Sequence, residues 1–372
     1  MRTGKIKGSK LEKPFLLFLT SLTFLTFLIF VLTLTFAFAV NETHLDKAKL
    51  PRGCASCHKG HGKRATVMLE SAKDELCFNC HGPARKGVPG EANTDISTVM
   101  LKKSVHPITQ TAQYHVIGET LPEMSPATPR HVSCYDCHNM HLSTKDKAFK
   151  GVRGYSGKGA KIKRSENEYE VCYLCHADSA NLPSKASNIA QKFDRNNASF
   201  HPVEAMGKNR SVPSLRSPLS TSSAITCSDC HGNDDKFGPK GPHGSNYANL
   251  LKANYTVESG PESPFAYELC YDCHTRSSIL NDDSFKSHKR HVLYANIPCF
   301  SCHDAHGSKS YDNLMNFDKN KVLPNSMGQL LYTKSIPGKP RCFLSCHIGA
   351  MNYEHKVNAG KYCVNANCPP GW

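Results

Sequence analysis

One short pattern constrains this chain more than any other: two cysteines separated by two residues, with a histidine directly after the second. It occurs seven times in 372 residues. Thiols at this spacing add to the two vinyl groups of a porphyrin, and the adjacent imidazole then binds the iron. Cys-x-x-Cys pairs also build zinc sites, but a zinc site does not need a histidine after every second cysteine. The pattern therefore predicts covalently attached c-type haem.

The motifs are numbered here in chain order. Motifs 1 to 7 are Cys54, Cys57 and His58; Cys77, Cys80 and His81; Cys134, Cys137 and His138; Cys172, Cys175 and His176; Cys227, Cys230 and His231; Cys270, Cys273 and His274; and Cys299, Cys302 and His303. Motif 8 has one extra residue between its thiols and consists of Cys342, Cys346 and His347. Because its Cys-His end is intact and it falls at a repeat position, we expect about eight haems. A disulfide or a singly attached haem is the alternative for motif 8.

The motifs form four pairs, and both members of each pair are followed by a further histidine. After the first members these are His61, His141, His243 and His306, and after the second members they are His106, His201, His288 or His291, and His355. We predict that these residues are distal ligands, so that each iron binds two imidazoles. His44, His115 and His131 are left over, either as alternative ligands or as ordinary surface residues.

The third pair differs from the others because His243 lies twelve residues after His231. Gly244 and Ser245 follow His243 just as Gly307 and Ser308 follow His306. We therefore interpret the extra residues before His243 as a loop insertion into an otherwise unchanged repeat.

The composition predicts a thin hydrophobic core. Only 39% of the residues are hydrophobic, and 25 glycines and 22 prolines interrupt regular structure. The haems would then supply much of the apolar interior. We expect a mostly irregular fold organised by the haems, with short α-helices at the motifs, long loops and little or no β-sheet.

The predicted domains follow the motif pairs. Residues 1–13 are basic and residues 14–40 are uncharged, which is typical of an export segment, so residues 1–39 are either a cleaved signal peptide or a membrane anchor. Residues 40–206 would form one tetrahaem half, residues 207–226 a Ser/Pro-rich linker and residues 227–372 a second tetrahaem half. Cys363 and Cys368 in the tail predict a disulfide, with a link to motif 8 or an unpaired thiol as alternatives.

The formal net charge of +15 does not indicate a nucleic-acid partner. Residues 2 to 13 carry five Lys or Arg against one Glu, so the export segment supplies part of that charge. Each bis-histidine haem adds about −1 when ferric and about −2 when ferrous, from its iron, porphyrin and propionates. Eight haems would bring the exported protein close to neutrality, and no nucleic acid is expected to bind.

With these motifs, the chain resembles the doubled CxxCH motif family of multihaem c-type cytochromes, which are similar to class III cytochromes c. The resemblance covers nearly everything from Cys54 to His355, and it departs at the wider spacing of motif 8 and at Cys363 and Cys368. It implies electron carriage outside the cytoplasm without a substrate of the protein's own. The implied partners are a membrane quinol-oxidising complex or other cytochromes.

The residues support the same function independently. Two imidazoles per iron leave no open coordination position, and bis-histidine ligation favours lower potentials than His/Met ligation. We expect an exported electron-transfer protein rather than an enzyme, on the periplasmic or extracellular side of the cytoplasmic membrane. It would contact the membrane through residues 1–39 if these are retained, and it could form an oligomer or filament. The alternative is a multihaem reductase or oxidase of the nitrite, hydroxylamine or tetrathionate type, with one open haem site.

Overall fold

The computed structural model describes residues 44–46, 50, 52–60, 68–71, 73–83, 95–108, 121, 132–144, 146–177, 182, 186–336 and 339–345. The expected export segment, residues 1–39, lies outside the described residues. Other residues singled out above also lie outside them, namely His61, His115, His131, Cys346, His347, His355, Cys363 and Cys368.

Each of motifs 1 to 7 begins on a short helical turn. The elements that carry them are η1 (Gly53–Ser56), α2 (Lys73–His81), α3 (Cys134–Cys137), α4 (Glu168–His176), η3 (Cys227–Asp229), α6 (Glu268–Tyr271) and η6 (Cys299–Ser301). Residues three apart share one face of such a turn, so the turn brings both thiols of a motif to one side. The histidine amide closes the turn, as where His138 N donates to Cys134 O over 2.9 Å.

Side-chain caps fix where several of these turns start. Ser133 with Asp136, Asn167 with Glu170, and Thr226 with Asp229 form capping boxes at α3, α4 and η3. Such caps satisfy the free amides of the first turn, which a helix of one or two turns cannot satisfy internally. The remaining helices of the described residues are η2 (Val99–Leu101), α5 (Ile189–Lys192), η4 (Ala248–Leu250), α7 (Arg276–Leu280) and the π-helix η5 (Lys289–Tyr294).

The strands in the described part of the chain form four antiparallel pairs. The pairs are β1 (Ser104–Val105) with β5 (Gly244–Ser245), β2 (Gly154–Tyr155) with β3 (Lys161–Ile162), β4 (Ser199–Phe200) with β6 (Gly307–Ser308), and β7 (Leu331–Ile336) with β8 (Lys339–Phe343). The strands of the first three pairs are each two residues long. This confirms the predicted fold, which is mostly irregular with short helices and very little sheet.

Two of these strand pairs are equivalent in the repeat. In β1–β5 Val105 pairs with Gly244, and in β4–β6 Phe200 pairs with Gly307. A Cβ at Gly244 would collide with the carbonyl oxygen of Val99, and one at Gly307 with that of Lys192. Glycine is therefore required where β5 approaches η2 and where β6 approaches the end of α5. The loop insertion before His243 leaves this pairing unchanged.

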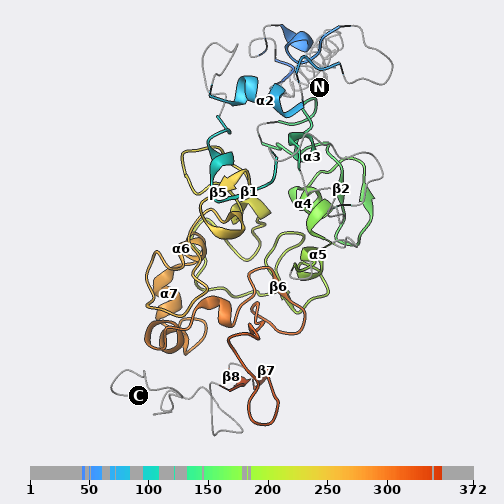
Figure 1. Cartoon of the computed structure of the whole chain (residues 1–372). Helices are drawn as coiled ribbons and strands as arrows, with labels where there is room; N and C mark the ends of the chain where they lie inside the picture. Colours follow the sequence, from blue (N-terminus) through green and yellow to red (C-terminus); the bar gives the residue numbers. More distant parts are fainter. Residues whose placement is uncertain are drawn as a thin grey trace, which may run out of the picture.

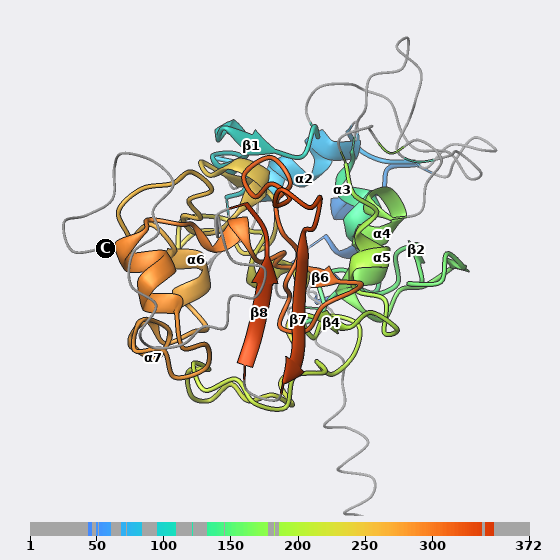
Figure 2. The same ribbon diagram turned by 90° about the horizontal axis from the view of Figure 1, so that it is seen from below.

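Helices α2 and α3 lie near one end of the molecule and the β7–β8 hairpin near the other, while β5 lies back beside β1 (Figure 1). In the view from below, α3, α4 and α5 lie on one side of this hairpin and α6 and α7 on the other (Figure 2). The two expected halves contact each other, because β1 and β4 precede the linker in sequence whereas their partners β5 and β6 follow it. The division into two halves stays a prediction.

The protein core of the described residues is divided into small clusters beside the motifs. One contains Tyr173, Phe193 and Phe200, another Tyr267, Leu280 and Val292, and a third Met315, Phe317 and Leu344. A fourth joins Met100 and Ile108 to a cysteine of motif 3. In the described part of the chain, no helix has the length and apolar character needed to cross a bilayer.

Candidate haem sites

Each proximal histidine of motifs 1 to 7 faces a second imidazole. The seven pairs, with their ring-centre separations, are His58 and His141 (6.1 Å), His81 and His44 (6.2 Å), His138 and His243 (6.0 Å), His176 and His106 (6.3 Å), His231 and His306 (6.1 Å), His274 and His201 (6.5 Å), and His303 and His288 (6.3 Å). With metal–nitrogen bonds of about 2 Å, and about 1 Å from nitrogen to ring centre, two imidazoles on opposite sides of one iron have centres ~6 Å apart. The residues present therefore fit a haem at each site. The sites take the numbers of their motifs.

The ring nitrogens are oriented for metal binding. Nδ1 lies 2.9 Å from Ala148 O in His138, 2.8 Å from Asn249 O in His231 and 3.0 Å from Asn313 O in His303. A carbonyl oxygen only accepts, so Nδ1 carries the proton in each ring and Nε2 keeps the lone pair that an iron needs.

Burial keeps these imidazoles neutral. It lowers the pKa of His176, His243 and His274 to about 4, with neighbouring imidazoles contributing in the same direction. It lowers the pKa of His288 to about 3. Neutral imidazole is the form that binds metal, so protons compete little for these sites near neutral pH.

The two kinds of motif receive their second histidine from opposite directions along the chain. At sites 1, 3 and 5 the facing histidine comes from the next pair and is His141, His243 and His306 respectively, whereas at site 7 it is His288, from earlier sequence. At sites 2, 4 and 6 the facing histidine comes from earlier sequence and is His44, His106 and His201 respectively. Consecutive pairs are therefore interlocked, because neither completes its sites alone.

Thiols of neighbouring pairs are in contact. Cys77 hydrogen-bonds with Cys134, Cys172 with Cys227, and Cys270 with Cys299. Each contact joins the first cysteine of an even motif to the first cysteine of the next odd motif. Sites 2 and 3, 4 and 5, and 6 and 7 are thus adjacent at their attachment edges.

A carboxylate supports two of these junctions from the even motif. Asp74 Oδ1 accepts from Cys134 N over 3.0 Å. Glu168 accepts from Ser228 N over 2.6 Å and from Ser228 Oγ over 2.8 Å. Burial raises the pKa of Glu168, and the Ser228 hydrogen bonds oppose that rise. The even motif thereby caps the first turn of the odd motif that it touches.

The distal ligands provide the other contacts between sites. His106 Nδ1 donates to Pro242 O over 2.9 Å, and Pro242 directly precedes His243. His201 Nδ1 donates to Ala305 O, and Ala305 directly precedes His306. Sites 3 and 4, and sites 5 and 6, are thus joined through their distal ligands. With the thiol contacts, this makes an unbroken series from site 2 to site 7.

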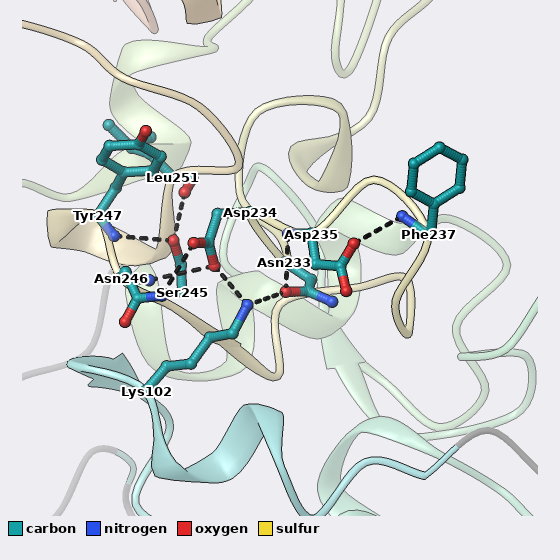
Figure 3. A network of polar contacts seen from close by, with 9 residues as sticks. All are labelled: Lys102, Asn233, Asp234, Asp235, Phe237, Ser245, Asn246, Tyr247 and Leu251. Atoms are coloured by element: carbon teal, nitrogen blue, oxygen red, sulfur yellow. Dashed lines mark hydrogen bonds and ion pairs between the residues drawn. The ribbon is translucent and has the colours of Figure 1, made fainter.

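A lysine holds each distal-ligand segment against the odd motif beside it. Lys102 Nζ, before His106, donates to Asp234 Oδ1 over 2.6 Å and to Asn233 Oδ1 over 2.5 Å (Figure 3). Asn246 also donates to Asp234, through N over 3.2 Å and Nδ2 over 3.0 Å. In the equivalent place Lys192 Nζ donates to Asp304 Oδ2 over 2.7 Å. The predicted insertion before His243 is thus a hydrogen-bonded loop.

Several ligand predictions can be compared with this geometry. His106, His141, His201, His243, His288 and His306 each face a proximal histidine, as the two-imidazole hypothesis requires. Sequence reasoning left His44 without a site, although it faces His81. The signal available was positional: even sites draw on earlier sequence, and His44 is the histidine that precedes motif 1. His61, His355 and the Cys346 and His347 of motif 8 lie outside the described residues.

Thiol pairs on helical turns, each followed by one of two opposed imidazoles, define a multihaem c-type cytochrome with covalently bound haem c. The doubled CXXCH motif family model matches residues 48–86. The model described as outer membrane cytochrome MtrC/MtrF-like, domains II/IV, matches residues 130–316, which is 187 of the 372 residues. The chain therefore belongs to the MtrC/MtrF-like family of multihaem cytochromes, which transfer electrons.

The chain is also similar to a full-length relative. It is 24% identical to the multiheme cytochrome MtrA of Shewanella baltica (strain OS185) over 340 residues, which cover 82% of this chain and 80% of that protein. No solved structure matches the chain.

Proposed function

We propose that this protein carries electrons between respiratory partners outside the cytoplasm, through eight bis-histidine haem sites arranged in sequence order. The observation that carries the proposal is the set of seven opposed imidazole pairs. Haem c supplies one-electron redox chemistry at such sites when bound. With an imidazole held on each side, an iron bound at any of these seven sites would have no open position for a substrate.

The contacts between sites support transfer along the molecule rather than independent reactions. Thiol contacts at the 2–3, 4–5 and 6–7 junctions alternate with distal-ligand contacts at 3–4 and 5–6. The residues thus hold consecutive sites close together. Helix α2, which carries motif 2, lies toward the opposite end of the molecule from β8, which carries Cys342 of motif 8 (Figure 1). Redox protein partners would then exchange electrons at the two ends.

The function is tested on the mature, exported protein. Intact mass and a pyridine haemochrome assay should give eight haems per chain, and ferric EPR should show only low-spin iron. The reduced protein should pass electrons to an external acceptor without turning over nitrite or hydroxylamine. A high-spin ferric component in the native protein, or steady nitrite turnover, would support the reductase alternative.

A further inference from the structure

The direction of ligand donation follows a rule that changes at site 7. Even-numbered sites 4 and 6 receive their distal histidine from the segment that follows the previous even motif: His106 for site 4 and His201 for site 6. Odd-numbered sites 1, 3 and 5 receive theirs from the next pair. Site 7 belongs to the fourth pair, and it is completed instead by His288, from the segment that follows motif 6.

By the rule for even sites, that same segment should also serve site 8. It contains a second histidine, His291, three residues after His288. Histidines three residues apart already serve different sites elsewhere in this chain. His138 belongs to site 3 and His141 to site 1, while His303 belongs to site 7 and His306 to site 5.

His291 has the local features of the ligands described above. It lies on the π-helix η5 (Lys289–Tyr294), where burial lowers its pKa and so favours neutral imidazole. Its Nδ1 lies 2.7 Å from Ser287 O, so Nδ1 carries the proton and Nε2 the lone pair. Short π-helical segments are frequent at functional sites, because the wider turn changes the direction of successive side chains.

One aromatic ring positions both histidines of this segment. The ring centre of Phe285 lies 5.1 Å from that of His288, at an interplanar angle of 79°, and 6.0 Å from that of His291, at 25°. At the 3–4 and 5–6 junctions the two distal ligands are connected by a hydrogen bond. Between His288 and His291, the connection is made instead by η5 and by their shared contact with Phe285.

The start of motif 8 lies next to site 7. Cys342 packs against the cluster of Met315, Phe317, Val322 and Leu344, and so does Cys302 of motif 7. The eighth attachment motif therefore begins beside the site that His288 completes.

We propose, resting on the function above, that His291 is the second axial ligand of the iron attached through Cys342. The segment from Phe285 to His291 would thus complete sites 7 and 8 at once. His355, which the sequence suggested for this role, would then not be needed as a ligand.

The test uses the full-length, exported, haem-loaded protein and two readouts: haem count, and the high-spin fraction in ferric EPR. His291→Ala and His288→Ala should each retain eight haems and convert one of the eight to high-spin. His355→Ala, the matched control, should convert none. His291→Met should keep that site low-spin and raise the potential of one haem, because thioether replaces imidazole. His291→Met keeps a side chain that can bind the iron, so it leaves no coordination position empty. It therefore still tests the proposal if His291→Ala does not fold.

A second set of variants, made in a chain without motif 8, identifies which iron His291 binds. Replacing Cys342 and Cys346 with Ala should leave seven haems, and in that background His291→Ala should add no high-spin iron, whereas His288→Ala should still add one equivalent. High-spin iron from His291→Ala with seven haems present would place His291 on a different iron and overturn the proposal, as would a high-spin signal from His355→Ala. A parent protein without haem would instead contradict the proposed function itself.

Discussion

The imidazole rings of His231 and His306 are parallel within 2°, and their centres are 6.1 Å apart, although 75 positions separate them in the sequence. One comes from the third motif pair and the other from the fourth. Site 5 is therefore built across the boundary between two repeats.

Replacement of His306 by Ala should leave the haem of site 5 attached but remove its second ligand. The thiols of motif 5 and His231 remain, so the haem count should stay at eight while one of the eight becomes high-spin. Ferric EPR, with haem content from a pyridine haemochrome assay, measures this. His115→Ala is the control, because His115 falls outside the repeat positions predicted to supply ligands. An unchanged EPR spectrum in His306→Ala would show that the site does not depend on this residue.

Gly307→Ala should disturb the same site from the backbone. The added Cβ collides with the carbonyl oxygen of Lys192, the last residue of α5, so β6 must move away from the end of α5 and take His306 with it. We expect a loss of about 1–3 kcal/mol in the free energy of unfolding, as for other overpacked positions, and a partial high-spin signal. Gly260→Ala is the matched control, since nothing lies within 4 Å of its added Cβ. Equal stability of the two variants would contradict the close approach of β6.

Lys102→Met should destabilise the fold by about 1–3 kcal/mol, because it leaves Asp234 and Asn233 without their shared donor. The side chains of Lys102 and Asp234 are only 17% and 15% exposed. Lys236→Met in the same loop is the control. Lys236 is 70% exposed in its ion pair with Glu268, and a surface pair contributes about 0–1 kcal/mol. Urea unfolding of both variants measures the difference.

The Lys102 effect should also depend on pH. Burial acts to raise the pKa of Asp234, but hydrogen bonds from Lys102 and Asn246 outweigh it and the pKa is lowered. At pH above the ordinary carboxyl pKa, a carboxyl group whose pKa is lowered in the folded state adds to the free energy of unfolding. That contribution is lost as the pH falls through the lowered pKa. The gap between wild type and Lys102→Met should therefore close under acidic conditions. A gap that widens with acid would show that Asp234 is not the partner.

Tyr173→Phe should weaken the cluster around α4. Tyr173 is fully buried, and its hydroxyl donates to Glu204 Oε1 over 2.6 Å. Without the Tyr173 hydroxyl, the partly buried Glu204 carboxylate loses a hydrogen-bond donor, which should lower the free energy of unfolding by about 1–3 kcal/mol. Tyr271→Phe is the control and should cost less, because Glu262 also accepts from Arg276. Chemical unfolding measures both, and a larger loss in Tyr271→Phe would contradict this ranking.

The Tyr173→Phe effect has the opposite pH dependence. Burial raises the pKa of Glu204, and the hydrogen bond from Tyr173 opposes that rise. A carboxyl group whose pKa is raised in the folded state adds to the free energy of unfolding at low pH. That contribution is lost as the pH rises through the raised pKa. Removing the Tyr173 hydroxyl raises the pKa of Glu204 further, so the variant should fall further behind wild type as pH increases. Unfolding at mildly acidic and at neutral pH should show this, with Tyr271→Phe changing less.

The sequence predicted those parts of the sites that depend only on the spacing of nearby residues. Two thiols and a histidine fit on one helical turn, so motifs 1 to 7 could be predicted from the order of residues alone. The fold class followed because too few hydrophobic residues are present for a single core. The β7–β8 hairpin could not be anticipated in the same way, because neither of its strands alternates regularly between apolar and polar residues.

The assignment of distal ligands could not be read from the sequence, because it depends on how the repeats pack. A histidine that follows one motif faces the proximal histidine of another, so proximity in sequence is a poor guide to the partner. His44 was left unassigned for this reason, since it lies outside the repeat and is recognised only by facing His81. His288 and His291 were left as alternatives, because a repeat position alone does not reveal that the histidine facing His303 comes from earlier sequence.

The facing histidines of sites 1 to 6 come from opposite directions along the chain, so odd-numbered and even-numbered sites in this range would be completed at different times during export. His106 precedes His176, and His201 precedes His274, so an even-numbered site has both of its imidazoles across the membrane as soon as its own motif emerges. His58 must wait for His141, which emerges 83 residues later, and His231 must wait 75 residues for His306. Maturation of a nascent chain would thus proceed in a staggered order, with each newly translocated repeat closing the site left unfinished by the one before it.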